Sequence, residues 1–277
     1  MRLRRSWRAT LCVLVAAATM TGCGGEPPRP GNTLASADAG KLTIGIRFDQ
    51  PGMGLKTLNK TYEGFDIDVA RYIAAELGVE PEDITWVETR PANRENFITG
   101  GAVDFVVGAY TIDEERKRQV AFAGPYLPYG QDLLVRRTDN SITGPQSLNG
   151  KRLCTVSEST SAQYVKDTFA HDTKLVQYKQ YSDCVSSLLA NLVDAITTGN
   201  ALLSGYAGQH PELLKVVDKP FTQRAYGIGL RKDDAASRSK INEALRKMIA
   251  SGAWRASLQA NLGPSGYTIP APPAING

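Results

Sequence analysis

A charged segment at residues 103–118 (VDFVVGAYTIDEERKR) contains the side chain best suited to bind an anion. Its apolar start predicts a buried strand, and Asp113 stands where the N-cap of a following helix belongs. A strand that leads directly into a helix leaves free backbone N–H groups at its carboxyl end, where open α/β sheets bind ligands. Arg116, one turn into that helix, can offer its planar guanidinium to a carboxylate there. The alternative is an ordinary surface arginine on a solvated helix.

The elements that must position this segment alternate between strands and helices. Strands are predicted at residues 41–48, 84–87, 103–107, 152–156, 174–178 and 194–197. Helices are predicted at residues 64–77, 93–98, 160–170, 182–190, 202–208, 237–251 and 254–262. Extended stretches at 131–136 and 225–230 connect the two strand–helix series. Two βαβ series with two extended crossings predict an α/β protein of two lobes with a polar cleft between them.

The first residues have the features of an export signal. Four arginines accompany an apolar core at residues 11–20, which is too short to span a membrane as a stable helix. Residues 20–23 (Met-Thr-Gly-Cys) resemble a bacterial lipobox, which predicts a lipoprotein signal peptide at 1–22 and lipidation of Cys23. The alternative is an ordinary secretory signal with an incidental cysteine. Residues 23–40, rich in Gly, Pro, Ala and Ser, are predicted to be a flexible tether.

The balance of charges excludes several classes of partner. The chain has 32 basic and 28 acidic residues, and four of the arginines lie in the predicted leader, so the remainder carries equal numbers of each. No basic patch indicates a nucleic-acid partner. The sequence has only His171 and His210 as histidines and no CxxC or HExxH motif, so neither a metal nor a cofactor is predicted.

Two cysteines, Cys154 and Cys184, remain once the leader and the lipidation candidate are set aside. Because exported proteins reside in an oxidising compartment, we predict a disulfide between them. The alternative is a pair of buried thiols.

Several segments resemble one protein family. Residues 64–77 (GFDIDVARYIAAEL) fit the signature of the bacterial extracellular solute-binding proteins of family 3, the polar amino acid receptors of ABC importers. The segments AYTIDEERKRQVAFAGPY, LNGKRLCTVSESTSAQYVK and VDAITTGNALLSGYA are similar to the family's ligand-arginine segment, the start of its second lobe and that lobe's return strand. The likeness is greatest to the glutamate-binding lipoproteins of actinobacteria, through IRFDQPG and the cysteine pair.

The resemblance implies a type II periplasmic-binding-protein-like fold. Two βαβ lobes would be joined by two hinge strands, with the ligand in the cleft between the lobes. Residues 41–129 and 227–277 would form lobe 1, and residues 130–226 would form lobe 2. Closure about the hinge would bury the ligand.

The resemblance also implies roles for residues on both sides of the cleft. Arg116 and Thr111, helped by backbone N–H groups near Ala109, would hold the ligand's α-carboxylate. From lobe 2, the hydroxyl groups of a Ser/Thr cluster would close over the same carboxylate, although such a cluster is also typical of a helix cap. The members of this cluster are Ser157, Thr160 and Ser161.

Two further arginines resemble those that meet the distal carboxylate of an acidic amino acid. They are Arg47, at the end of the first strand, and Arg94, in the segment PANR. Three arginines in one cleft have little reason to be there without an anion, because mutual repulsion and partial burial are costly unless offset. The alternatives are a surface charge on an edge strand for Arg47 and a surface charge at a helix start for Arg94.

One position departs from the family pattern. Where the family carries an acidic residue for the ligand's α-ammonium group, this chain reads Thr197-Thr198-Gly199-Asn200. We count Thr198, Gly199 and Asn200 among the predicted ligand-binding residues, but an ammonium group needs an acceptor that glycine lacks. Asp49 or the side chain of Asn200 would substitute. Alternatively, the ligand is an acidic molecule without that amine, or the affinity is low.

The sequence therefore predicts a substrate-binding lipoprotein of an ABC-type importer, not an enzyme, held outside the cytoplasm by a lipid on Cys23. The protein would act as a monomer and deliver its ligand to permease subunits in the membrane. Glutamate is the first expected ligand, followed by aspartate, glutamine and asparagine. One alternative is a sensor lipoprotein that signals to a membrane partner. Another is a dehydratase-like enzyme on the same scaffold, although the S-x-x-K match at residues 237–240 lacks its accompanying motifs.

Overall fold

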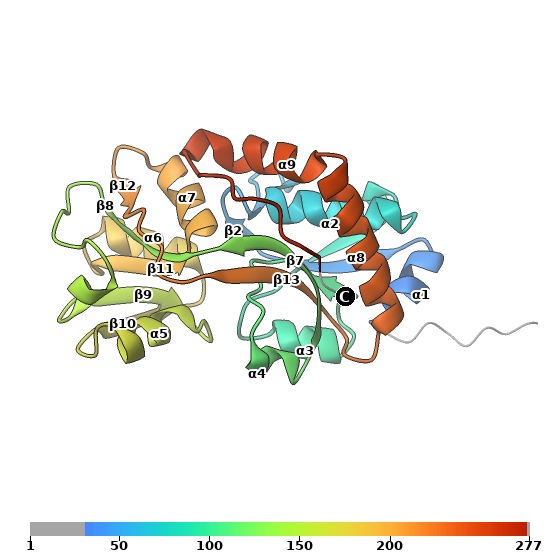
Figure 1. Ribbon diagram of the computed structural model, residues 1–277, viewed down its shortest axis with the longest axis horizontal. Helices are drawn as coiled ribbons and strands as arrows, with labels where there is room; N and C mark the ends of the chain where they lie inside the picture. The colour runs from blue at the N-terminus through green and yellow to red at the C-terminus, as the bar shows by residue number, and fades with distance from the viewer. Residues whose placement is uncertain (1–30, 276–277) are drawn as a thin grey trace, which may run out of the picture.

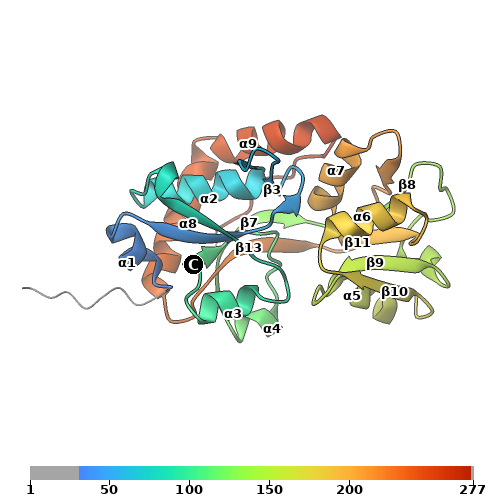
Figure 2. The same ribbon diagram turned by 180° about the vertical axis from the view of Figure 1, so that it is seen from behind.

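The computed structural model describes residues 31–275 as two lobes (Figure 1). The predicted signal peptide, the predicted lipidation site Cys23 and the first part of the predicted tether lie outside the described residues. Each lobe is built on a five-stranded mixed sheet, and a three-stranded sheet accompanies the first. Figure 2 shows the same arrangement from behind. No helix in the described part of the chain has the length and apolar character that a membrane crossing requires.

Lobe 1 contains the sheet with strand order β5-β1-β6-β13-β7. Its strands are β1 (Leu42–Ile46), β5 (Ile84–Glu88), β6 (Phe105–Val106), β7 (Ala121–Tyr129) and β13 (Arg224–Leu230). Strands β5, β1 and β6 are parallel, as expected of a βαβ series, whereas β13 is antiparallel to both β6 and β7. A late strand of the chain thus returns to the first sheet and lies between β6 and β7.

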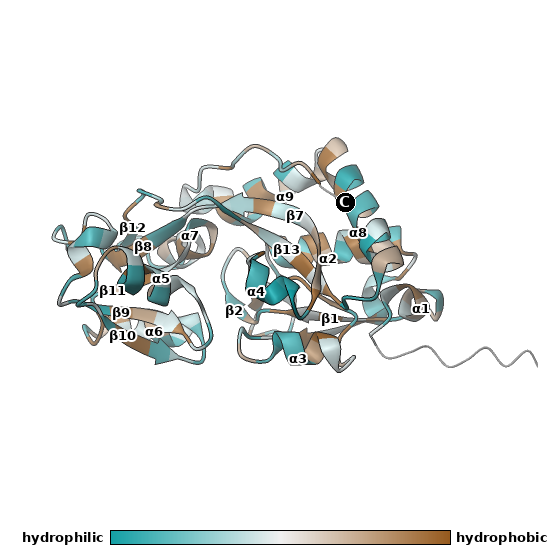
Figure 3. Cartoon of the chain, turned by 60° about the horizontal axis from the view of Figure 1, so that its bottom comes forward, coloured by the Kyte–Doolittle hydropathy of each residue, from teal (hydrophilic) through white to brown (hydrophobic). Residues whose placement is uncertain are grey.

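Helices cover both faces of the lobe 1 sheet. They are α1 (Thr33–Asp38), α2 (Phe65–Glu76), α3 (Arg94–Thr99), α4 (Glu114–Lys117), α8 (Ala235–Ala250) and α9 (Ala253–Leu262), with short 3-10 helices η1 (Pro81–Asp83) and η3 (Gly263–Ser265). Figures 1 and 2 show α2, α8 and α9 on one side of the sheet and α3 and α4 on the other. Helix α8 mixes hydrophobic and hydrophilic residues (Figure 3), and its apolar face, which includes Ile241, Leu245 and Met248, is buried.

The family signature at residues 64–77 forms the start and body of α2. Gly64 has a φ of 120°, and a Cβ there would overlap the carbonyl oxygen of Met53, so only glycine fits. Apolar residues at helical spacing then enter the core of lobe 1. They are Phe65, Val69, Ala70, Ile73 and Ala74.

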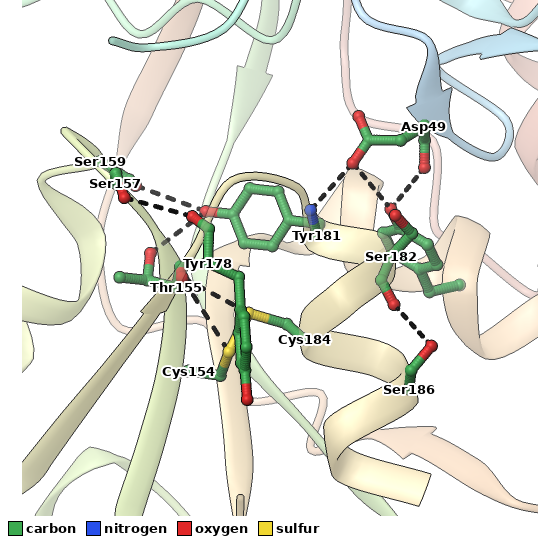
Figure 4. Close-up of a disulfide and its surroundings, with 11 residues drawn as sticks. Asp49, Cys154, Thr155, Ser157, Ser159, Tyr178, Tyr181, Ser182, Cys184 and Ser186 are labelled. Carbon is green, nitrogen blue, oxygen red and sulfur yellow. Dashed lines mark hydrogen bonds between the residues drawn. A yellow bond between two sulfur atoms is a disulfide. The ribbon is translucent and has the colours of Figure 1, made fainter.

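Lobe 2 contains the sheet with strand order β10-β9-β11-β8-β12. Its elements are β8 (Gln131–Arg136), η2 (Pro145–Leu148), β9 (Arg152–Val156), α5 (Ser161–Thr168), β10 (Lys174–Tyr178), α6 (Tyr181–Leu189), β11 (Ala195–Gly199), α7 (Asn200–Gln209) and β12 (Leu214–Val216). Strands β10, β9 and β11 are parallel. Cys154 of β9 and Cys184 of α6 form the disulfide that the sequence predicts (Figure 4).

The connection between the lobes differs in one respect from the prediction. The stretch at 225–230 lies in β13, which pairs with β7, and these two strands lead toward lobe 2 (Figure 1). The stretch at 131–136, also predicted as a crossing, is instead β8, an antiparallel member of the lobe 2 sheet between β11 and β12. Its Leu133 and Val135 are fully buried, so this stretch belongs to the core of lobe 2.

The predicted tether also differs from the structure, because its last part is helix α1. Asn32 caps this helix by accepting a hydrogen bond from the Ala35 backbone N–H. The buried Thr33 donates its backbone N–H to Asp234 and its hydroxyl to the carbonyl oxygen of Asp104. These contacts with distant parts of lobe 1 fix residues 33–38, a result that composition alone could not indicate.

The small sheet consists of β2 (Asp49–Gln50), β3 (Gly54–Lys56) and β4 (Tyr62–Glu63). It follows β1 directly, so it extends the carboxyl end of that strand. Strand β2 contacts α6 and α7 of lobe 2. This sheet therefore brings lobe 1 residues to the boundary between the lobes.

Candidate ligand-binding site

A buried cavity lies between the lobes, lined by residues of both. Eight of the residues predicted to bind ligand line it: Arg47, Arg94, Ala109, Thr111, Arg116, Thr160, Ser161 and Thr198. Four do not: Asp49, Ser157, Asn200 and Gly199. Sequence reasoning missed further lining residues, namely Gln50, Pro91, Gly108, Ser159, Tyr181, Leu202 and Tyr226.

Arg116 lies where the opening segment predicts. Asp113 caps α4 by accepting a hydrogen bond from the Arg116 backbone N–H at 2.9 Å. The guanidinium folds back over the loop, donates to the carbonyl oxygen of Thr111 at 3.0 Å and pairs with Asp113 at 3.1 Å. Figure 3 shows α4 itself as a hydrophilic helix. Arg116 is nevertheless only 9% exposed, so it is not the surface arginine that was the alternative interpretation.

Arg94 packs beside Arg116 on the same aromatic ring. Its guanidinium carbon lies 3.6 Å from the centroid of the Tyr110 ring, and that of Arg116 lies 5.5 Å away. The Tyr110 hydroxyl donates to Glu95 at 2.6 Å, and Glu95 also contacts both arginines. Burial, followed by the charge of Arg116, lowers the pKa of Arg94 to about 10. Arg94 remains a cation at neutral pH, held in a site that a neighbouring cation disfavours.

Arg47 is tied to its own lobe and, through Asp49, to the other. Its guanidinium pairs with Asp49 at 2.7 Å and donates to the carbonyl oxygen of Thr89. The second oxygen of Asp49 accepts the backbone N–H of Tyr181, the first residue of α6, at 2.8 Å (Figure 4). The hydroxyl of Tyr206, on α7, donates to the Asp49 backbone carbonyl. Asp49 therefore joins the lobes at a helix N-terminus, where a negative charge is stabilised.

The prediction that Asp49 accepts a ligand ammonium group is not met by this geometry. Its carboxylate oxygens are taken up by Arg47 and Tyr181, and the residue does not line the cavity. The other proposed substitute, Asn200, also points elsewhere. Its side-chain oxygen accepts the backbone N–H of Ala201 at 3.0 Å and that of Gly130 at 3.4 Å, as befits the first residue of α7.

Gly199 cannot be replaced by the acidic residue that the family carries. A Cβ at this position would overlap the hydroxyl of Tyr226 and crowd the ring of Tyr129. The two tyrosine rings stack at 4.0 Å, and the Tyr129 hydroxyl is hydrogen-bonded to Thr111 at 2.7 Å. The aromatic pair thus occupies the space that a side chain at residue 199 would need.

The backbone N–H of Ala109 itself has a partner within lobe 1. Its N–H donates to Asp66 at 2.9 Å, so this group is not free to bind a ligand carboxylate. Asp66 is fully buried in α2 and also accepts the hydroxyl of Tyr126 at 2.7 Å. Burial raises the pKa of Asp66 to about 7, against smaller opposing effects of these two hydrogen bonds. Asp66 holds Ala109 in a backbone conformation with a φ of 44°, which is unusual for a residue other than glycine.

The Ser/Thr cluster of lobe 2 divides into two groups. Ser157 donates to the carbonyl oxygen of Tyr178 and lies outside the cavity. Ser159, Thr160 and Ser161 line it, at the turn from β9 into α5. The Thr160 side chain makes no capping hydrogen bond, whereas Ser159 accepts the Ser161 N–H at 3.4 Å. Ser159 therefore caps α5, and the Thr160 hydroxyl remains available at the cavity.

Some of the missed lining residues could have been found from the sequence, and others could not. Gln50 follows Asp49 within the segment IRFDQPG, and Ser159 lies within SESTS, so both were adjacent to predicted residues. Tyr181, Leu202 and Tyr226 reach the cavity through the packing of α6, α7 and β13, which no local pattern reveals. Among the described residues, no group of three His, Cys, Asp or Glu side chains could hold a metal ion.

Arginines of lobe 1 and hydroxyl groups of lobe 2 line one cavity, and this arrangement defines the class of the protein as a two-lobed α/β binding protein with its site between the lobes. The chain belongs to the bacterial extracellular solute-binding proteins, family 3, whose family model matches residues 42–264. Proteins of this family bind solutes, and the chain is a binding protein rather than an enzyme.

Individual relatives agree with this assignment. The chain is 40% identical over 271 residues to the glutamate-binding protein GluB of Corynebacterium efficiens, which covers 94% of this chain and 92% of the relative. It is 32% identical over 247 residues to the ABC transporter glutamine-binding protein GlnH of Bacillus subtilis, which covers 87% and 89%. A solved structure of an ancestral arginine-binding protein bound to glutamine matches with a TM-score of 0.75 and 33% identity, over 81% of this chain and 98% of that one.

The S-x-x-K match has a structural explanation. The Ser237 hydroxyl accepts the backbone N–H of Leu34 in α1, and Lys240 pairs with Glu243 on the exposed side of α8. Neither residue lines the cavity.

A tight contact between the two lobes suggests a test of closure. A Cβ at Gly205 in α7 would overlap the carbonyl oxygen of Pro51, which belongs to lobe 1. We expect Gly205→Ala to weaken ligand affinity about tenfold, because overpacking at a tight contact costs about 1–3 kcal/mol. The ligand-free protein should not unfold at a lower temperature, since alanine favours a helix over glycine. Calorimetric titration and thermal unfolding measure the two effects.

The matched control for this variant is Gly144→Ala, where a Cβ would contact only the flexible end of Gln146. This control should bind ligand as the wild type does. Wild-type affinity in Gly205→Ala would show that the lobes close without this contact.

Asp66 predicts a specific dependence of stability on pH. Its folded-state pKa of about 7 lies above its ordinary 3.8, so the carboxyl group favours the folded protein below about pH 4 and this contribution is lost as the pH rises to about 7. Asp66→Asn removes the titration. We expect its free energy of unfolding, relative to the wild type, to increase from pH 4.5 to pH 7.5 in urea denaturation. A constant difference across this range would contradict the raised pKa.

Proposed function

We propose that this protein captures L-glutamate outside the cytoplasm and delivers it to an ABC permease. The main support for this proposal is that the charged side chains lining the cavity are all positive. Every charged residue that lines it is an arginine, and the three are between 2% and 9% exposed. Their carboxylate partners Asp49, Glu95 and Asp113 lie outside the lining.

Desolvated cations favour a ligand of net negative charge. Glutamate carries two carboxylates and one ammonium group, whereas glutamine is neutral overall and arginine is positive. The second carboxylate of glutamate brings a further negative charge that offsets the repulsion between Arg94 and Arg116, whereas glutamine brings only its α-carboxylate. The relatives named for glutamate and for glutamine make these two amino acids the comparison that matters.

The arrangement of donors supports two positions for the two carboxylates. Arg116 and Thr111 in lobe 1, opposite Thr160 and Ser161 in lobe 2, would hold the α-carboxylate. Arg94, with Arg47 beyond it, would hold the distal carboxylate. Closure would bring the two sets together, with Asp49 joining the lobes through Tyr181.

The transport role extends this proposal to the cell surface. The lipobox at residues 20–23 supports an anchor through lipid on Cys23, which would keep a monomeric receptor beside the permease. Membership of an extracellular solute-binding family supports the location outside the cytoplasm.

Removal of Arg116 tests the proposed position of the α-carboxylate. We expect Arg116→Ala to lose L-glutamate affinity by about 30-fold or more, because deleting a desolvated partner of a charge pair costs about 2–5 kcal/mol. Arg118→Ala, on the exposed side of the same helix end, is the matched control and should bind normally. Equal affinities of the two variants in calorimetric titration would defeat the assignment.

A second variant tests the distal carboxylate. Arg94→Gln should weaken L-glutamate by about tenfold or more and L-glutamine far less, because only glutamate presents a second charge to residue 94. Arg94 is preferable to Arg47 here, since removal of Arg47 would also leave Asp49 without its ion-pair partner. Titration of both ligands gives the ratio of affinities. Parallel losses for the two amino acids would place the distal group elsewhere.

A further inference from the structure

Gln50 presents an unusual polar atom at the cavity. In the described part of the chain, two buried side-chain polar atoms lack a hydrogen-bond partner, and they are Oε1 of Gln50 and Oδ2 of Asp132. Gln50 is 3% exposed and lines the cavity, whereas Asp132 does not. A buried carbonyl oxygen without a partner destabilises a protein, so its presence at a binding site calls for a donor from the ligand.

The position of Gln50 restricts what can serve as that donor. Gln50 is the last residue of β2, a strand of lobe 1 that contacts α6 and α7, and the lining of the cavity also includes Leu202 and Tyr226. Because Gln50 is buried, the local dielectric is low and a hydrogen bond made there is strengthened. Carboxylate groups only accept hydrogen bonds, so neither carboxylate of an acidic ligand can pair with Oε1.

The cavity otherwise offers no anionic acceptor to an ammonium group. Every charged lining residue is an arginine, and a guanidinium only donates. A carboxylate at residue 199 is excluded by the hydroxyl of Tyr226. Asp49 is engaged by Arg47 and by the Tyr181 N–H. The hydroxyl groups of Thr160 and Ser161 are proposed as donors to the α-carboxylate, and that of Thr111 is shared with Tyr129.

We propose that Oε1 of Gln50 accepts a hydrogen bond from the ligand's α-ammonium group, in place of the acidic residue that is absent at position 199. This inference rests on the proposed function, because it takes an amino acid as the ligand. It makes Gln50 the residue that distinguishes an amino acid from the corresponding dicarboxylic acid. A neutral acceptor also leaves the cavity positive, so it serves the amine without weakening the attraction for two carboxylates.

Gln50→Met provides the test, because methionine has nearly the same shape and cannot accept a strong hydrogen bond. Calorimetric titration would use L-glutamate and glutarate, which is glutamate without its amine. We expect the variant to bind L-glutamate about tenfold or more weakly, as for a lost hydrogen bond to a charged group, with its affinity for glutarate unchanged. Equal losses for both ligands, or no loss for L-glutamate, would overturn the inference.

A control variant and a crystal structure provide two further tests of the role of Gln50. Gln163→Met, at an exposed residue of α5 that bonds only to Asp167 among the described residues, is the matched control and should bind both ligands as the wild type does. A crystal structure of the wild type with L-glutamate should place the amine nitrogen roughly 3 Å from the side-chain oxygen of Gln50. An amine out of reach of Gln50 would also overturn the inference. A wild type that binds no L-glutamate would instead contradict the proposed function.

Discussion

The burial of like charges against one aromatic ring is the constraint on which the rest of the structure depends. Arg94 and Arg116 both face Tyr110, and their proximity contributes to the lowered pKa of Arg94. Glu95 is placed between them and receives the Tyr110 hydroxyl. Such a cluster is costly in isolation and is best explained by an anion that completes it. The turn between β6 and α4 positions this cluster at the carboxyl end of the lobe 1 sheet.

The second requirement is that the two lobes recognise each other as well as the ligand. Asp49 serves both needs, since one oxygen fixes the Arg47 guanidinium and the other meets the N-terminus of α6. The disulfide ties α6 to β9, so the helix end that receives Asp49 is joined covalently to the sheet of lobe 2 (Figure 4). Gly205 allows α7 to approach the Pro51 carbonyl oxygen. Closure of the lobes therefore depends on polar contacts and close packing between the segment around β2 and the helices α6 and α7.

Local patterns were sufficient for the order of strands and helices and for the placement of Arg116. The apolar runs, the N-cap at Asp113 and the α2 signature each carry their own signal, and Arg116 follows from the strand and cap before it. Patterns failed where the answer depends on a distant partner. Nothing near Ala109 shows that Asp66 takes its N–H, and nothing near Gly199 shows that Tyr226 fills the space beside it. The helix at residues 33–38 likewise depends on Asp104 and Asp234, far along the chain.

We infer that the positive charge of the arginines lining the cavity selects the ligand. Titration calorimetry of the wild-type protein with L-glutamate, L-glutamine and L-arginine tests it most directly, because these three amino acids share one backbone and differ in net charge. We expect affinity to fall in that order, and we expect the advantage of glutamate to persist at high salt because the arginines are buried. Tighter binding of glutamine or arginine than of glutamate would contradict it.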